Sequence, residues 1–213
     1  MKQENTMLIF DLDGTLIDSN GIWVQVDKTF LARRGLTYTK EYYEGVAHTI
    51  LQNCAVFTRE FFHLEESCEE IIAEWMALAK DAYSNVALKP HVREYLERCR
   101  ASGKPMAVFT SCVPEHIQAA FQLHGLDEFF PQVISAHKMG MDKKSPEVFR
   151  KVAEMLGVSP RECVLFDDSL TACKAAKAAG MTVVGVYDDY FQDNRVDMQE
   201  LCDQYIRDFG ELL

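Results

Sequence analysis

The sequence predicts an α/β fold: a doubly wound parallel sheet with an all-helical segment inserted after its first strand. Two observations predict the sheet. An apolar strand near the N-terminus ends in acidic residues, and from residue 105 onward short apolar segments alternate with helical ones. Apolar strands separated by helices form parallel sheets that helices cover on both faces. A third observation, the lack of a convincing strand over residues 21–86, predicts the insertion.

The first strand is expected at Leu8–Phe10, where an apolar run is followed by a turn-forming Asp-Gly pair. The insertion that comes next is expected to be helical. Apolar residues recur at helical spacing from Trp23 to Leu31, and Gly35 is suited to end that helix. Further helical stretches are expected over Glu41–Phe62 and Cys68–Tyr83.

After the insertion, strands and helices alternate to residue 186. Pro90 is expected to open a helix, Ser145 to cap another and Gly180 to end a third. Strands are expected over Pro105–Thr110, Val133–Ser135, Cys163–Phe166 and Thr182–Val186. Helices are expected over Pro114–His124, Pro146–Leu156 and Leu170–Ala179. This division predicts an α/β core domain of residues 1–18 and 88–213 and a helical cap domain of residues 19–87.

Composition narrows the possible partners. The chain has 213 residues, 48% of them hydrophobic, and a net charge of −11, so nucleic acids and anionic membranes are not expected as partners. It contains no run of 18 apolar residues and no apolar signal-peptide core. Seven cysteines without a CxxC pair indicate reduced thiols, which favours a cytoplasmic location. Cys112 is singled out because it follows a strand expected at the site.

Two acidic pairs at strand ends are the most informative feature of the chain. Asp11 and Asp13 follow the first strand, and Asp167 and Asp168 end the strand VLFDD. The carboxyl ends of strands are where α/β sheets bind ligands. Carboxylates so close repel each other unless a cation or a proton shares the site, and Mg²⁺ with its oxygen ligands meets that need. The alternative for the first pair is solvated turn aspartates, because Asp and Gly are common in turns.

Polar groups also follow other expected strands. Thr110 and Ser111 end the second core strand, where their hydroxyls could donate hydrogen bonds to a bound oxyanion. Lys143 and Lys144 precede a helix N-terminus, a position that favours anions. The alternatives are an ordinary strand end and solvated loop lysines. All these groups are expected to face one crevice at the carboxyl edge of the sheet.

Together these residues resemble the haloacid dehalogenase superfamily of hydrolases with a helical cap of the first type. Four of its motifs occur in order: DLDGT at Asp11–Thr15, FTS at Phe109–Ser111, KKSPEVF at Lys143–Phe149 and FDDSLTACKAAKAAGM at Phe166–Met181. The chain is most similar to the phosphoglycolate phosphatase and β-phosphoglucomutase-like group, which implies a Rossmann-like core. Lys144 stands where Pro is usual and Ala172 where Gly is usual. The motif lysine is thus Lys143 or Lys144, and the spacing to Pro146 favours Lys143.

The resemblance implies a Mg²⁺-dependent phosphatase that acts on a small phosphorylated metabolite. Asp11 would be the nucleophile that forms an aspartyl-phosphate, and Asp13 the general acid and base. Lys143 would neutralise the phosphoryl group, while Thr110 and Ser111 would bind its oxygens. The metal ligands would be Asp11, the backbone carbonyl of Asp13, Asp168 and, in a secondary role, Asp167.

The cap is expected to select the substrate, with Trp23 and His48 as candidate contacts; the alternatives are a cap-core Trp23 and a solvated His48. In mutase-like relatives a His matches Trp23 and an Arg lies near His48, so this chain's residues count against a phosphomutase, the nearest alternative function. More distant alternatives are a metal-independent dehalogenase and a receiver-like module that binds through a phospho-Asp. Asp13 counts against both. The expected protein is a monomer or a weak homodimer.

Overall fold

The computed structural model of the chain describes residues 6–47 and 49–213. Within them a six-stranded parallel sheet has the order β3-β2-β1-β4-β5-β6, which confirms the doubly wound α/β fold. The order of the strands reverses beside β1, which pairs with both β2 and β4, so the crevice for a ligand lies at the carboxyl ends of these three strands. The strands are β1 (Met7–Phe10), β2 (Met106–Thr110), β3 (Gln132–Ser135), β4 (Cys163–Asp167), β5 (Thr182–Val186) and β6 (Gln204–Ile206).

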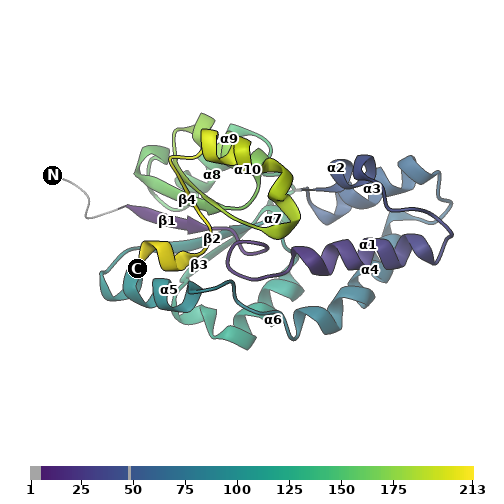
Figure 1. Ribbon diagram of the computed structural model, residues 1–213, viewed down its shortest axis with the longest axis horizontal. Helices are drawn as coiled ribbons and strands as arrows, with labels where there is room; N and C mark the ends of the chain where they lie inside the picture. The colour runs from purple at the N-terminus through teal and green to yellow at the C-terminus, as the bar shows by residue number, and fades with distance from the viewer. Residues whose placement is uncertain (1–5, 48) are drawn as a thin grey trace.

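Helices cover both faces of this sheet (Figure 1). Side chains of β1 alternate between the faces, so Leu8 and Phe10 join the apolar cluster on the α5 and α6 side, while Ile9 joins the cluster on the α8 and α9 side. Parallel sheets require this double cover because their strands are apolar on both faces. The helices are α5 (Val92–Ala101) and α6 (Pro114–His124) on one side, and α8 (Pro146–Met155), α9 (Leu170–Ala179) and α10 (Arg195–Leu201) on the other.

The insertion folds into a helical cap beyond the carboxyl edge of the sheet (Figure 1), as expected. It consists of α1 (Asn20–Ala32), α2 (Lys40–Val46), α3 (Leu51–Phe62) and α4 (Cys68–Tyr83). Ser67 and Glu70 form a capping box that starts α4, which satisfies backbone N–H groups that have no partner within the helix. Trp75 of α4 packs edge-on against Phe30 of α1, with ring centroids 5.5 Å apart, and both side chains are buried.

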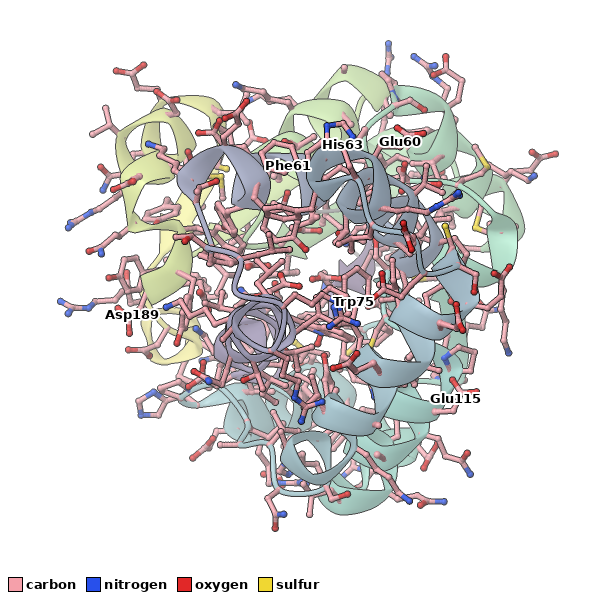
Figure 2. All side chains as sticks on the ribbon, turned by 90° about the vertical axis from the view of Figure 1, so that its right-hand side faces the viewer. Glu60, Phe61, His63, Trp75, Glu115 and Asp189 are labelled. Carbon is pink, nitrogen blue, oxygen red and sulfur yellow. The ribbon has the colours of Figure 1, made fainter. Side chains whose placement is uncertain are left out.

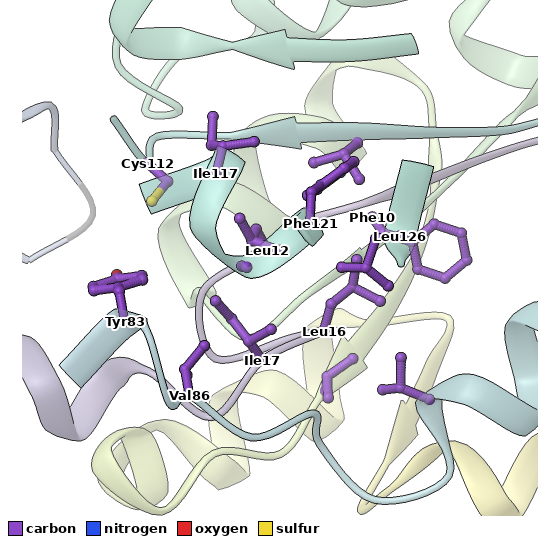
Figure 3. Packing of buried hydrophobic residues seen from close by; sticks show 14 of the residues in the cluster. Phe10, Leu12, Leu16, Ile17, Tyr83, Val86, Cys112, Ile117, Phe121 and Leu126 are labelled. Carbon is purple, nitrogen blue, oxygen red and sulfur yellow. The ribbon is translucent and has the colours of Figure 1, made fainter. Parts of the chain in front are cut away.

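Two chain segments join the cap to the core, and they are hydrogen-bonded to each other. Asp18 N donates to Ala87 O at 2.9 Å, and Lys89 N donates to Leu16 O at 2.9 Å. Figure 3 shows Ile17 and Val86 from these segments close to apolar side chains of the core, and both are buried. The paired segments fall where the sequence predicts the boundaries of the cap, and those exact boundaries stay a prediction.

The helical stretch expected over Glu41–Phe62 is interrupted between α2 and α3. Ala47 and Ile50 have extended backbone conformations with ψ of 137° and 152°. Ile50 N donates to the carboxylate of Asp142 at 2.8 Å. This bond to the core domain replaces the backbone hydrogen bond that Ile50 N would make within a continuous helix. Sequence periodicity within the cap contains no sign of that contact.

Other differences from the expected elements are local. Pro90 does not open α5, which begins at Val92, because His91 adopts the left-handed conformation with φ of 61°. The sequence did not predict α10, β6 or the short α7 (Ala136–Met139). It also missed the short 3₁₀ turns at Leu126–Glu128, Pro160–Glu162, Asp189–Asn194 and Phe209–Leu212. None of the described helices has the length and apolar character that a membrane span needs.

Candidate active site

A cavity of about 180 Å³ lies where the carboxyl ends of β1, β2 and β4 meet the cap. Strand ends bring together residues that are up to 157 positions apart in the sequence, from Asp11 to Asp168. Every core residue that the sequence singled out for the site lines this cavity: Asp11, Asp13, Thr110, Ser111, Lys143, Asp167 and Asp168. The parallel topology therefore places the four motifs in one crevice.

The loop after β1 turns the chain back over the strand ends. Its apolar residues Leu12 and Leu16 are fully buried and belong to the same apolar cluster as side chains of α6 (Figure 3). Gly14 has φ of +74°, and a Cβ atom there would lie 2.1 Å from Asn20 Nδ2 and 2.3 Å from Asp168 Oδ2. Only glycine fits that position. The turn allows Asn20, the first residue of α1, to donate a hydrogen bond to Asp168 Oδ2 at 2.8 Å.

Lys143 lies between two carboxylates at the bottom of the cavity. Its Nζ donates to Asp11 Oδ1 at 2.8 Å and to Asp167 Oδ2 at 2.6 Å, and its side chain is 5% exposed. Burial opposes the charge, but the contacts with Asp11 and Asp167 together raise the pKa of Lys143 above its usual value. Lys144 is exposed. The structure thus brings Lys143, not Lys144, to Asp11.

Three buried carboxylates, which we call the carboxylate cluster, converge beside Lys143. Asp11, Asp167 and Asp168 each offer an oxygen atom within 4.8 Å of the others. Burial raises the pKa of Asp11 to about 7, although Lys143 opposes the rise. Burial, and then the charges of Asp167 and Asp11, raise the pKa of Asp168. One ammonium therefore does not balance three carboxylates, and a hard divalent cation with oxygen ligands fits the position.

Hydrogen bonds fix the orientation of two members of the carboxylate cluster. Thr15 Oγ1 donates to Asp168 Oδ1 at 3.1 Å, so both oxygens of Asp168 have a donor from the loop after β1 or from α1. Ser169 N donates to Asp167 Oδ1 at 2.9 Å. Carboxylates held in this way are preorganised ligands for a metal.

The side chain of Asp13 lies outside the carboxylate cluster and is hydrogen-bonded to Ser19 and Tyr83. Its Oδ1 accepts hydrogen bonds from Ser19 Oγ at 2.6 Å and from Tyr83 OH at 2.5 Å. Trp23 Nε1 donates to the same tyrosine oxygen at 2.7 Å, and the Tyr83 ring stacks on His116 with centroids 4.0 Å apart. The cap helix α4 therefore contacts Asp13 directly through Tyr83, and α1 contacts it indirectly through the bond from Trp23 to Tyr83.

The end of β2 contributes hydroxyl groups to the cavity. Thr110 Oγ1 accepts a hydrogen bond from Cys112 N at 3.0 Å, which leaves its own proton for another acceptor. Ser111 Oγ is buried and has no partner among the described residues. Burial, followed by the charge of Asp13, raises the pKa of Cys112, so this thiol stays protonated and is not an activated nucleophile.

Comparison with known proteins identifies the family. Residues 8–186 match the family model described as haloacid dehalogenase-like hydrolase. The chain belongs to this family.

Two curated relatives and one crystal structure illustrate the similarity. The bifunctional riboflavin kinase/FMN phosphatase of Arabidopsis thaliana is 23% identical over 188 residues, which cover 87% of this chain but 49% of that protein; the chain thus spans about half the length of this relative. The probable pseudouridine-5′-phosphatase of Drosophila melanogaster is 29% identical over 189 residues, which cover 86% and 82% of the two chains. A haloacid dehalogenase hydrolase of family IA, variant 3, from Entamoeba histolytica shares the fold with a TM-score of 0.81 at 20% identity, over 97% of this chain and 95% of that one.

In this haloacid dehalogenase-like hydrolase, the residues on the cap side of the cavity differ most from those that the sequence predicted. Trp23 lines the cavity as expected, but its indole nitrogen is bonded to Tyr83. His48 lies outside the described residues. Sequence reasoning missed Tyr83, Asp27 and Trp75, which also border the site or its cavity. Tyr83 and Trp75 fall on the apolar pattern of α4, where helical spacing indicates core positions and does not reveal a role at the site.

Proposed function

We propose that this chain is a Mg²⁺-dependent phosphatase that hydrolyses a small phosphate monoester through an aspartyl-phosphate on Asp11. The observation that carries the proposal is the buried contact of Lys143 with both Asp11 and Asp167, beside a third carboxylate and under a helical cap. Membership of the hydrolase family and the phosphatase names of two relatives support the same class of reaction.

Asp11 supplies the nucleophile and Asp13 the proton transfers. In the first step an oxygen of Asp11 bonds to phosphorus, the ester P–O bond breaks, and the leaving oxygen takes a proton from Asp13. In the second step Asp13 takes a proton from water, whose oxygen attacks phosphorus. Inorganic phosphate leaves and the Asp11 carboxylate is restored. Lys143 holds Asp11 and places a positive charge where the phosphoryl oxygens arrive, while Thr110 and Ser111 donate to those oxygens.

The carboxylate cluster and the backbone carbonyl of Asp13 would hold Mg²⁺. The fit rests on the donor chemistry, because three carboxylate oxygens converge and, among the described residues, one buried ammonium opposes their charge. When bound, Mg²⁺ would offset the repulsion between the Asp11 carboxylate and the phosphate dianion.

The composition of the cap favours hydrolysis over transfer of the phosphoryl group to a second position on a sugar. A mutase must hold the far phosphate of a bisphosphate, and a guanidinium suits that task because it binds phosphate at two points. The described cap residues that line the cavity include neither lysine nor arginine. With no such anchor, water is expected to react with the aspartyl-phosphate.

Phosphate release from a panel of phosphate monoesters with Mg²⁺ tests the proposal. The wild-type protein should release phosphate from a simple monoester without a bisphosphate primer. Asp11→Asn keeps the shape of the side chain but removes the attacking charge, so kcat should fall by about 10³-fold or more. Full activity in excess EDTA would contradict the metal dependence. Formation of glucose 6-phosphate from β-glucose 1-phosphate, faster than phosphate release, would show a mutase.

A further inference from the structure

The cap half of the cavity extends far beyond the carboxylate cluster. Four residues of α1 line it at positions i, i+3, i+4 and i+7: Asn20, Trp23, Val24 and Asp27. Residues at this spacing share one face of a helix. Asn20 is bonded to Asp168, and seven residues of α-helix span about 10 Å. The alcohol part of a bound phosphate ester thus has about 10 Å of space along α1.

Aromatic side chains line this half of the cavity, together with aliphatic ones such as Val24, Val46 and Leu51. Trp23, Tyr43 and Trp75 come from α1, α2 and α4, and Tyr38 and Phe191 also line the cavity. The rings of Tyr43 and Phe191 are near-parallel, with centroids 6.1 Å apart and an interplanar angle of 29°. Figure 2, which looks onto the cap end of the molecule, shows Trp75 near the middle of the view, among the cap helices. Flat aromatic surfaces favour a planar ring as their ligand, because rings stack on one another.

Two residues that line the cavity each carry a buried polar atom with no hydrogen-bond partner among the described residues. Trp75 Nε1 and Tyr43 OH are buried without a hydrogen bond among the described residues, and Trp75 is only 2% exposed. Buried donors of this kind are nearly always paired, because leaving them unpaired is costly. A ligand that carries hydrogen-bond acceptors at its far end would satisfy them.

Asp27 adds an acceptor to the lining of the same cavity. Its Oδ1 receives a hydrogen bond of 3.3 Å from Tyr42 OH, and its carboxyl borders the cavity. Burial raises the pKa of Asp27 to about 7, opposed by the bond from Tyr42. In its ionised form this carboxyl repels a second phosphate or a carboxylate on the substrate, and it accepts a hydrogen bond from an N–H or O–H group.

We propose that the alcohol part of the substrate carries an uncharged planar nitrogen heterocycle, as in a nucleoside 5′-monophosphate. The heterocycle lies between the aromatic side chains, a ring N–H donates to Asp27, and ring carbonyl groups accept from Trp75 Nε1 and Tyr43 OH. This inference rests on the proposed phosphatase activity for the position of the phosphate, but the ring-binding half of the cavity can be tested without catalysis.

The first experiment compares kcat/KM for uridine and inosine 5′-monophosphates with kcat/KM for glycerol 3-phosphate and phosphoglycolate. The nucleotides should be preferred by about tenfold or more, as expected for several added contacts. Tyr43→Phe and Trp75→Phe each remove one donor and keep a ring. Each should reduce the ratio of nucleotide to glycerol 3-phosphate turnover by about fivefold or more. Tyr187→Phe, which removes an exposed hydroxyl bonded to Asp189, is the matched control and should leave the ratio unchanged.

The second experiment measures binding of the free nucleosides uridine and inosine. Trp23 and Trp75 are the two tryptophans of the chain, and both line the cavity, so tryptophan fluorescence should report a stacked ring. Saturable quenching by nucleosides but not by glycerol supports the inference about ring binding. If nucleosides quench but no ester is hydrolysed, the ring-binding inference stands and the phosphatase proposal is overturned. Turnover that prefers the aliphatic esters, together with no quenching, would overturn the inference and leave the phosphatase proposal intact.

Discussion

At the scale of single residues, charge balance governs the candidate active site. Lys143 is the buried cation of the carboxylate cluster, and it contacts Asp11 and Asp167 but not Asp168 in the described hydrogen bonds. Asp168 is therefore the member whose charge is least compensated within the protein, and its pKa is raised by burial first and by Asp167 next. A site arranged in this way is destabilised when it is fully ionised and stabilised when a cation binds.

Asp168→Asn tests this balance. The change keeps the shape of the side chain but removes one negative charge, so the metal-free variant should be at least as stable as the wild type at pH 8. A carboxyl whose pKa is raised in the folded protein destabilises it once the pH exceeds the lower pKa of the unfolded chain, and this cost disappears with the charge. The rise in Tm caused by Mg²⁺ should shrink by at least half in a thermal denaturation assay. An equal Mg²⁺-induced rise in both proteins would show that Asp168 is not a ligand.

At the scale of elements, α4 connects the cap to the chemistry of the core. Its last residue, Tyr83, donates to Asp13, and Trp75, two turns earlier, lines the far part of the cavity. The capping box at Ser67 and Glu70 fixes the other end of the helix. One helix therefore carries contacts to both ends of the cavity, and the cap position and the orientation of Asp13 depend on each other.

Tyr83→Phe tests Tyr83 as a positioning residue for Asp13. The change removes the hydroxyl that donates to Asp13 Oδ1 and leaves Trp23 Nε1 without its acceptor. For an alkyl phosphate, whose leaving oxygen needs a proton, kcat should fall about 10-fold. For p-nitrophenyl phosphate, whose leaving group needs no proton, the fall should be much smaller. Equal losses on both substrates would indicate a structural role only, and Tyr187→Phe is the matched control.

At the scale of the whole molecule, polar contacts hold the cap against the core. Asp142, next to Lys143 in the chain, accepts hydrogen bonds from Thr49 Oγ1 at 2.6 Å, Ile50 N at 2.8 Å and Asn53 Nδ2 at 2.8 Å, all at the start of α3. Within the core, just after the chain returns from the cap, Lys89 forms a largely buried ion pair of 2.8 Å with Asp188, which follows β5. The contacts of Asp142 hold the described cap over the cavity, which excludes water from the site, and the Lys89 pair stabilises the junction beside it.

Lys89→Met tests the ion pair at this junction. The side chain of Asp188 is only 1% exposed, so the change leaves a buried carboxylate without its cation. The free energy of unfolding, measured by urea denaturation, should fall by about 3 kcal/mol. The control is Lys40→Met, because Lys40 and Asp193 are 75% and 82% exposed and 3.7 Å apart, and its effect should stay below about 1 kcal/mol. Similar losses in both variants would contradict the role given to Lys89.

The sequence by itself determined the fold class, the helical insertion and the core of the candidate site. Those features depend on short segments: an apolar strand followed at once by its polar residues, as in LIFDLDGT and VLFDDS. Because parallel strands align their carboxyl ends, the neighbours of each strand end follow from topology alone. The cytoplasmic location, the oligomeric state and the exact cap boundaries stay predictions.

Only the tertiary structure decided between Lys143 and Lys144, connected Tyr83 to Asp13 and placed Asp27 and Trp75 in the cavity. The residues in these contacts lie far apart in the sequence, as with Tyr83 and Asp13, which are separated by 70 positions. Side chains on a helix share the same apolar periodicity whether they face a core or a ligand. The packing of the cap helices, and not the local sequence, determines which of them reach the site.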